Sequence, residues 1–253
     1  MRIFLKTEDE IILLRAASQL ATRALIEVGR HVVPRLALSH LRNKVVNAVM
    51  RTVPTESNSG KEALSSDTEF TFFVNGAYIK PSLEGEYMLC EGDWLTVNCW
   101  VCLDGYYSFG AHTFIVGSSQ DDEPMISTLR DMLRQVVRRA SAGHSIKEMS
   151  RTVYSLHAHD PYVLQKTFGH GVGRNRVENP ILRMNPGVND TVLLKEGMCL
   201  VIALAFKHGR SHFIKPRLMH ESTFHNPFVP FGTTVVVRPG RPEILTSFET
   251  IVK

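Results

Sequence analysis

Apolar residues recur with a helical period near the start of the chain. The sequence Thr7-Glu8-Asp9-Glu10 has the pattern of a capping box, in which Thr7 caps an early backbone N–H and Glu10 reaches back to the cap. Apolar side chains then keep a helical spacing as far as Val28. A second pattern of this kind predicts a helix over about Leu38–Val53, and the polar residues that follow predict a loop.

The order of helices followed by strands begins again after Gly117. Runs of apolar and β-branched residues predict strands in the first half of the chain at Phe70–Val74 and Trp94–Val101. In the second half, helices are predicted from Pro124 and over Ser145–Leu156. The strands predicted in that half are Tyr162–Leu164, Cys199–Phe206 and Thr233–Val237.

An internal repeat supports this division into halves. The segment Glu91-Gly92-Asp93-Trp94-Leu95-Thr96-Val97-Asn98 resembles Glu196-Gly197-Met198-Cys199-Leu200-Val201-Ile202-Ala203, and each is a short turn that leads into an apolar strand. We therefore expect an α+β fold in which helices pack on one side of a curved, mostly antiparallel sheet built from two similar halves. We expect one domain over residues 1–253, with a ligand cleft between the halves.

The composition is that of a globular protein. Apolar residues make up 43% of the 253 residues and charged residues 21%. No apolar run approaches the roughly 20 residues that a membrane helix needs, and the acidic residues close to Met1 leave no room for a signal-peptide core. We therefore expect a cytoplasmic protein without a membrane partner. Cys99 and Cys102 lie three apart on a predicted strand, so their thiols should point to opposite faces and stay reduced.

Basic residues suggest further partners. Arg130, Arg134 and Arg138 form a stripe along a predicted helix, which would suit nucleic acid, although a solvated helix face is the simpler interpretation. The basic segment Lys207–Pro230 contains several phenylalanines, which either form a binding surface or pack the loop onto the domain. Histidines in this segment and at residues 157–159 lack the fixed spacing of metal ligands, so we predict no metal site there.

Several motifs, in the same order and spacing, resemble methionine aminopeptidases. They are Leu5-Lys6-Thr7-Glu8-Asp9-Glu10-Ile11, Asn75 with Gly92-Asp93, Leu103-Asp104-Gly105-Tyr106, His112-Thr113-Phe114-Ile115-Val116-Gly117, Gly169-His170-Gly171-Val172-Gly173-Arg174, Glu196-Gly197-Met198 and Glu243-Ile244-Leu245-Thr246. The resemblance covers nearly the whole chain and implies the pita-bread fold of that family.

The resemblance also implies a set of site residues, and most of them are replaced here. The family binds two divalent metals through two Asp, one His and two Glu, and two further histidines contact the substrate. In this chain the five ligand positions hold, in that order, Asn98, Phe109, His170, Ala203 and Gly232, and the two histidine positions hold Lys80 and Val177. The loss of four carboxylates removes the charge that would hold two dications, so we predict no metal and no cofactor.

From these substitutions we predict a catalytically inactive relative, a pseudoenzyme with no catalytic residues. Its remodelled cleft, formed by the seven positions just named, would bind a peptide or a protein surface. The alternative is a metal-dependent aminopeptidase or another hydrolase of altered, weak activity that uses His170 in a new site. Nucleic-acid binding is a further alternative with little support.

Overall fold

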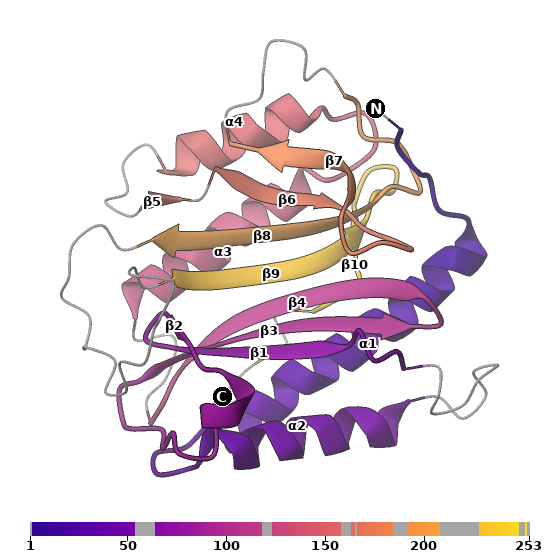
Figure 1. Cartoon of the computed structure of the whole chain (residues 1–253). Coiled ribbons are helices and arrows are strands. Elements are labelled where there is room, and N and C mark those ends of the chain that lie inside the picture. The colour runs from indigo at the N-terminus through magenta and orange to yellow at the C-terminus, as the bar shows by residue number, and fades with distance from the viewer. Residues whose placement is uncertain are drawn as a thin grey trace.

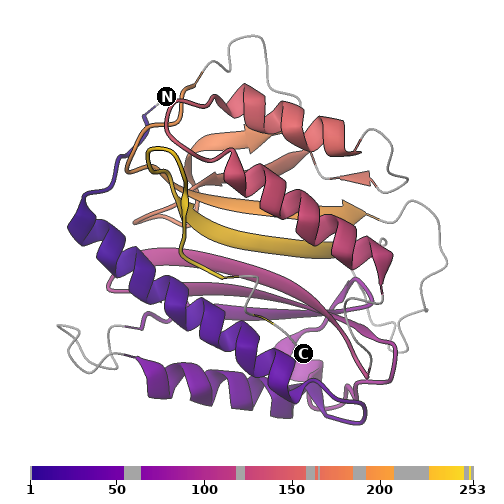
Figure 2. The same cartoon turned by 180° about the vertical axis from the view of Figure 1, so that it is seen from behind.

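In the part of the chain that the structure describes, ten antiparallel strands form one sheet, and the helices cover one of its faces (Figures 1 and 2). In the computed structural model the residues described are 2–53, 64–117, 123–157, 163–164, 166–184, 192–207, 228–247 and 251. Within those ranges, no helix is both long enough and apolar enough to cross a membrane. The face of the sheet opposite the helices is called the helix-free face below.

The elements fall into two halves with the same order of helices and strands. The first half contains α1 (Glu8–His31), α2 (Leu38–Thr52), β1 (Glu69–Val74), β2 (Ala77–Tyr78), the short 3₁₀ helix η2 (Pro81–Leu83), β3 (Trp94–Leu103) and β4 (Tyr106–Ile115). The second half contains α3 (Pro124–Arg138), α4 (Ile146–His157), β5 (Val163–Leu164), β6 (Thr167–Gly171), β7 (Glu178–Arg183), β8 (Cys199–Lys207), β9 (Phe228–Val236) and β10 (Glu243–Ile244).

The strand order brings the two halves together in the middle of the sheet. Neighbouring strands follow the order β2-β1-β3-β4-β9-β8-β6-β7, with β10 paired to β9 and β5 paired to β8. The halves therefore meet where β4 lies beside β9, and among the described residues one Cα pair, Ala111 with Gly232, is in register there. This junction is called the seam below, and the expected two-half α+β architecture is confirmed.

Side chains along β3 point alternately to the core and to the helix-free face of the sheet. Leu95, Val97 and Cys99 are fully buried and pack in the cluster that α1 and α2 cover. Asn98 and Trp100 alternate with these residues along the strand, so they face the helix-free side and are partly exposed. A second cluster joins α3 and α4 to the apolar residues of β8 and β9.

The turns of the predicted repeat have the same backbone conformation. Gly92 and Gly197 have φ angles of 79° and 82°, the left-handed region that favours glycine. One turn leads into β3 and the other into β8. The repeat seen in the sequence is therefore a structural repeat, and the residues Asn98 and Ala203 occupy equivalent positions in it.

The predicted helices are confirmed, including the capping box at Thr7, but parts of the sheet were missed. β6 and β7 were not predicted, and β4 was expected only from a resemblance at its end. The helix-facing residues of β4 include Ser108 and Gly110, which break the apolar alternation. Gly110 permits a close approach, because a Cβ there would lie 2.7 Å from Thr246 Cγ2.

Buried hydroxyl groups fasten the halves where the strand ladder is shortest. The Thr234 hydroxyl accepts the Phe109 N–H at 2.9 Å and donates to the Phe109 carbonyl at 2.9 Å. The Ser108 hydroxyl lies 3.2 Å from Thr234 Oγ1 and 2.7 Å from the Ser18 hydroxyl of α1. Side-chain hydrogen bonds from Thr234 thus supplement the strand ladder across the seam.

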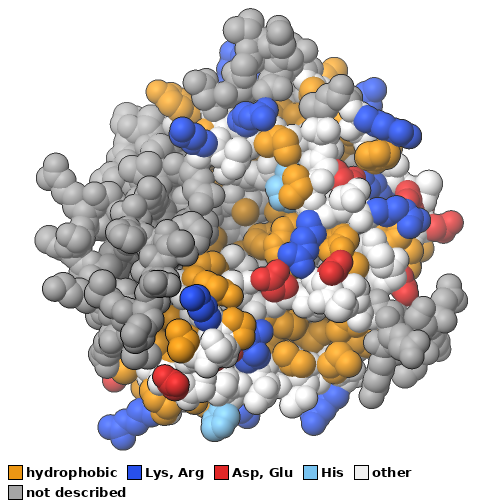
Figure 3. Space-filling view, in the orientation of Figure 1, with side chains coloured by type: hydrophobic (Ala, Val, Ile, Leu, Met, Phe, Trp, Pro, Cys, Tyr) orange, Lys and Arg blue, Asp and Glu red, His pale blue; other side chains and the backbone are white. Residues whose placement is uncertain are grey.

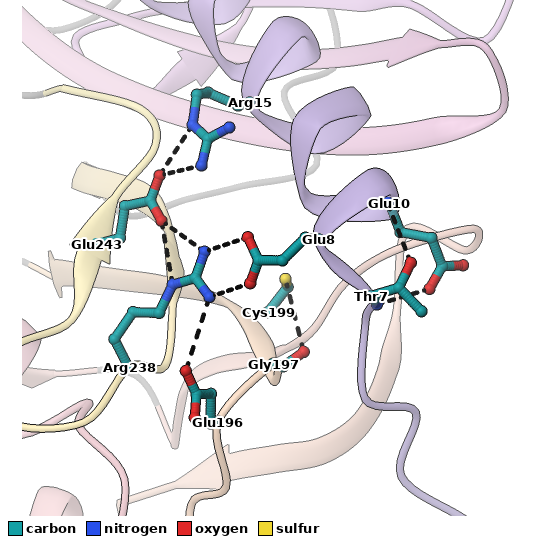
Figure 4. A network of polar contacts seen from close by, with 9 residues as sticks. All are labelled: Thr7, Glu8, Glu10, Arg15, Glu196, Gly197, Cys199, Arg238 and Glu243. Carbon is teal, nitrogen blue, oxygen red and sulfur yellow. Dashed lines mark hydrogen bonds and ion pairs between the residues drawn. The ribbon is translucent and has the colours of Figure 1, made fainter.

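Ion pairs join the first turn of α1 to the end of the second half (Figure 4). Arg238 follows β9 and binds the carboxylates of Glu8 and Glu243, with Nη2 at 2.9 and 3.1 Å from their oxygens. Arg15 of α1 also reaches Glu243, at 2.6 Å. The hydrogen bond from Arg238 lowers the pKa of Glu8.

Replacing Thr234 by Val should destabilise the protein. The substitution keeps the shape of the side chain but leaves the buried N–H and carbonyl of Phe109 without this partner, which costs about 1–3 kcal/mol. The free energy of unfolding, measured in denaturant, tests the expectation. Thr234→Ser keeps the hydroxyl and is the control. Equal stabilities for the two variants would show that the hydroxyl does not matter.

Candidate functional site

Three of the positions identified in the sequence, Asn98, Gly232 and Ala203, lie in one row across the seam. Asn98 pairs with Ala111, Ala111 with Gly232, and Gly232 with Ala203, so one row of side chains crosses β3, β4, β9 and β8. Directly opposed residues of antiparallel strands share a face, so the row lies on the helix-free face. Asn98 and Ala203, equivalent in the repeat, end the row on either side of the seam.

An aromatic cluster lies beside this row. Trp100 pairs with Phe109 on the neighbouring strand, and their ring centroids are 4.8 Å apart. The ring of His170, from β6, lies nearly parallel to Trp100 at 6.1 Å. Trp100, Phe109 and His170 are called the aromatic cluster below. Apolar side chains gather in a hollow near the middle of the helix-free face (Figure 3).

The hydrogen bond of His170 determines which ring nitrogen can act as a base. Nδ1 lies 2.8 Å from the carbonyl oxygen of Gly171 and must donate to it, because a carbonyl can only accept. The neutral ring therefore carries its proton on Nδ1 and a lone pair on Nε2. Burial lowers the pKa of His170 below its ordinary value and outweighs the opposite effect of the hydrogen bond. The neutral form, which can accept a proton, is thus favoured.

The glycines around His170 allow close packing between strands. A Cβ on Gly171 would lie 2.3 Å from the carbonyl oxygen of Asn179, and one on Gly173 would lie 2.4 Å from Lys6 Cε. Lys6 forms an ion pair with Glu178, and both side chains are 5% exposed. The glycine-rich motif therefore positions His170 by letting β7 and the N-terminal segment approach.

The ring of Phe109 fills the space opposite Gly232. A Cβ on Gly232 would lie 2.6 Å from Phe109 Cε1 and 3.1 Å from the Cβ of Ala203. These positions are the ones at which the resemblance places carboxylate ligands. An aromatic ring now occupies the room between them.

The residues present do not fit a pair of divalent metals. Asn98 offers one neutral oxygen, Oδ1, which is buried and has no hydrogen-bond partner among the residues that the structure describes. Within the same ranges, no three His, Cys, Asp or Glu side chains are grouped so as to hold a metal ion. Any chemistry in this cleft must therefore come from His170 and its neighbours.

The remaining sequence-predicted residues lie outside the row and the aromatic cluster. Lys80 is exposed and precedes η2, and Val177 is 58% exposed just before β7. Sequence reasoning missed Trp100, although strand alternation from Asn98 places it on the same face. It also missed Arg176, next to Val177, whose guanidinium lies 5.6 Å from the Trp100 ring centroid.

Other sequence predictions concern residues that the structure does not describe. Residues 208–227 of the basic segment lie outside the described ranges, as do residues 158–160. The arginine stripe lies on α3, where Arg134 forms an ion pair with Asp131 at 2.7 Å. Binding of nucleic acid stays a prediction.

Comparison with known proteins identifies the family. Residues 12–239 match metallopeptidase family M24. The chain belongs to this family. Among curated M24 relatives, methionine aminopeptidase of Clostridium perfringens is 26% identical over 248 residues, or 96% of this chain and 98% of that protein. Methionine aminopeptidase of Helicobacter pylori is 29% identical over 220 residues, or 83% of this chain and 85% of the relative.

The M24 fold is also found in solved structures. The crystal structure of methionine aminopeptidase from Thermotoga maritima has a TM-score of 0.77 to this chain at 20% identity, and covers 97% of this chain and 100% of its own. This likeness confirms the pita-bread fold that the sequence motifs predicted. The resemblance to methionine aminopeptidases is confirmed with it.

Our prediction that this M24 protein is not an enzyme is wrong. The relatives that match nearly its full length are named methionine aminopeptidases, and these comparisons point to an enzyme. The prediction treated the loss of four carboxylates, at Asn98, Phe109, Ala203 and Gly232, as the loss of all catalysis. That loss argues against one mechanism, and a half-buried histidine with a defined tautomer can support another. A peptide or protein partner and a cytoplasmic location stay predictions.

Replacing Gly232 by Ala should destabilise the protein by about 1–3 kcal/mol, because the added methyl overpacks against Phe109. In a Phe109→Ala background, which lacks the ring, the same change should lower the free energy of unfolding by about 1 kcal/mol less, or by a still smaller amount. Denaturant unfolding measures both differences. Gly85→Ala is the matched control, since a Cβ at Gly85 has no neighbour within 4 Å. Additive effects of the two substitutions would refute the contact.

Proposed function

We propose that this chain is an aminopeptidase-like hydrolase of altered, weak activity that acts at the N-terminal end of a peptide and uses His170 as its general base. The tautomer of His170 carries the proposal. With Nδ1 donating to Gly171 at 2.8 Å, Nε2 is the nitrogen that can take a proton from water. The water oxygen would attack the peptide carbonyl, and the imidazolium would return the proton to the leaving amine.

The surroundings of His170 support a peptide as the substrate. Trp100 and Phe109 give an apolar wall, and an apolar wall suits a thioether or aliphatic first side chain. Asn98 Oδ1, buried without a partner in the described part of the chain, can accept a hydrogen bond from a peptide N–H. The names of the relatives, methionine aminopeptidases, agree with a substrate whose first residue is methionine.

Replacing His170 by Gln should abolish most of the hydrolysis. Gln keeps a polar side chain of similar size but cannot accept a proton, so release of Met from a Met-Ala-Ser peptide should fall by about 10²-fold or more. Amino-acid release, followed by chromatography in the presence of a chelator, measures the loss.

His144→Gln is the control for this variant. His144 precedes α4, and its Nδ1 forms a hydrogen bond with the Ser141 hydroxyl at 2.9 Å. It lies outside the aromatic cluster, so its replacement should leave the rate of hydrolysis unchanged. If the Gln variant at position 170 cleaves the peptide as fast as the native protein, His170 is not the base.

As the pH is lowered, the rate of hydrolysis should begin to fall at a lower pH than it would if the base were a histidine of ordinary pKa. Burial lowers the pKa of His170, so the neutral base persists as the pH falls past about 6.5 and is protonated only below it. Removing the ring of Trp100 in a Trp100→Ala variant exposes the imidazole and should move the acid limb to higher pH. Identical acid limbs in the two proteins would contradict this account.

A further inference from the structure

Arg176 reaches from the second half to the first across the aromatic cluster. It lies in the loop between β6 and β7, and its Nη1 is 2.9 Å from Glu69 Oε2. Its Nη2 donates to the backbone carbonyl of Asp67. Its guanidinium carbon lies 5.6 Å from the Trp100 ring centroid and 5.8 Å from that of Tyr107. A single cation thus contacts a carboxylate, a carbonyl and two aromatic rings.

These acceptors belong to the first half and make contacts that do not involve Arg176. Glu69 of β1 is directly opposite Trp100 of β3 in the strand register. Tyr107 donates its hydroxyl to Asp67 at 2.6 Å, and its backbone N–H donates to Gly173 at 2.8 Å. The group of Asp67, Glu69, Trp100 and Tyr107, here called the cation subsite, is therefore preformed on the sheet.

Arg176 can leave the cation subsite while its loop stays anchored. The buried ion pair of Lys6 with Glu178 lies at the end of this loop, and Glu178 accepts the backbone N–H of Asn175 at 3.2 Å. The Arg176 and Glu69 side chains are 35% and 52% exposed, and an ion pair so exposed to water contributes little stability. A competing cation could therefore displace the guanidinium at small cost.

We infer that the cation subsite binds the α-ammonium of a peptide and that Arg176 occupies it until the peptide arrives. Trp100 borders both the subsite and the ring of His170. An ammonium in the subsite would therefore lie one aromatic side chain away from His170. This inference rests on the proposed peptide substrate and names the group by which the cleft recognises it. Carboxylate and aromatic faces are the partners that a cation prefers.

The test is equilibrium binding of a Met-Ala-Ser peptide. The sequence has two tryptophans, so a Trp94→Phe background leaves Trp100 as the reporter, and the peptide should change its fluorescence. Arg176→Ala removes the competing cation and should tighten binding by about three- to tenfold, the range expected for one partly exposed ion pair with a cation–π contact. Adding Glu69→Gln to that variant removes the carboxylate of the subsite and should therefore abolish the gain in affinity for the peptide.

Arg174→Ala is the matched control, because it removes the same charge from the same loop at a residue that contacts Tyr106 and Glu10. Its affinity for the peptide should equal that of the parent protein. The N-acetylated peptide, which lacks the α-ammonium, should bind the Arg176→Ala variant no more tightly than the parent. A lysine-containing acetylated peptide that does gain affinity would assign the subsite to a side chain and overturn the inference.

Unchanged or weaker binding by Arg176→Ala would also overturn it, as would an absence of peptide binding by every variant. The measurement needs no hydrolysis, so it separates the two proposals. Tighter peptide binding by Arg176→Ala together with full activity of His170→Gln would support the cation subsite and show that His170 is not the general base. Loss of activity in His170→Gln with no change of affinity in Arg176→Ala would support His170 as the base and refute the cation subsite.

Discussion

The contact between β4 and β9 is the constraint on which the rest of this structure depends. The two halves share one sheet, yet in the described part of the chain one Cα pair, Ala111 with Gly232, is in register where they meet. The hydroxyl of Thr234 supplements this short ladder by bonding both the N–H and the carbonyl of Phe109. Because these groups are buried, leaving them unpaired would cost more than the hydrogen bonds themselves contribute. The relative placement of the halves, and of everything on the helix-free face, follows from this junction.

The seam also decides what the cleft contains. Asn98 and Ala203 come from equivalent strands of the repeat and lie at the ends of one row, with the smallest residue, Gly232, inside it. The missing side chain leaves room for the ring of Phe109, which packs there and contacts Trp100. A site that the family builds from charged ligands is here lined by apolar and aromatic groups. Such surroundings favour the neutral form of His170, since burial disfavours its charged form.

Charged residues remain important at the rim of the cleft. Arg176 bridges the halves above Trp100, and Lys6 with Glu178 holds the loop that carries Arg176. The rim thus combines a buried ion pair, which fixes the loop, with an exposed one, which can exchange partners. Buried pairs are costly to break and exposed pairs are not, so the two contacts suit anchoring and exchange respectively.

The sequence by itself determined the helices, the capping box at Thr7, the two turns of the repeat and the family. These features depend on residues close together in the chain, whose spacing directly reflects local geometry. It also indicated the positions Asn98, Ala203 and Gly232, because the motifs of the family keep their spacing. Only the tertiary structure decided that Phe109 fills the space facing Gly232, that Gly171 selects the tautomer of His170, and that Arg176 lies over Trp100. The last contact joins residues far apart in sequence, and it exists because strand register and the seam bring two halves of the chain together.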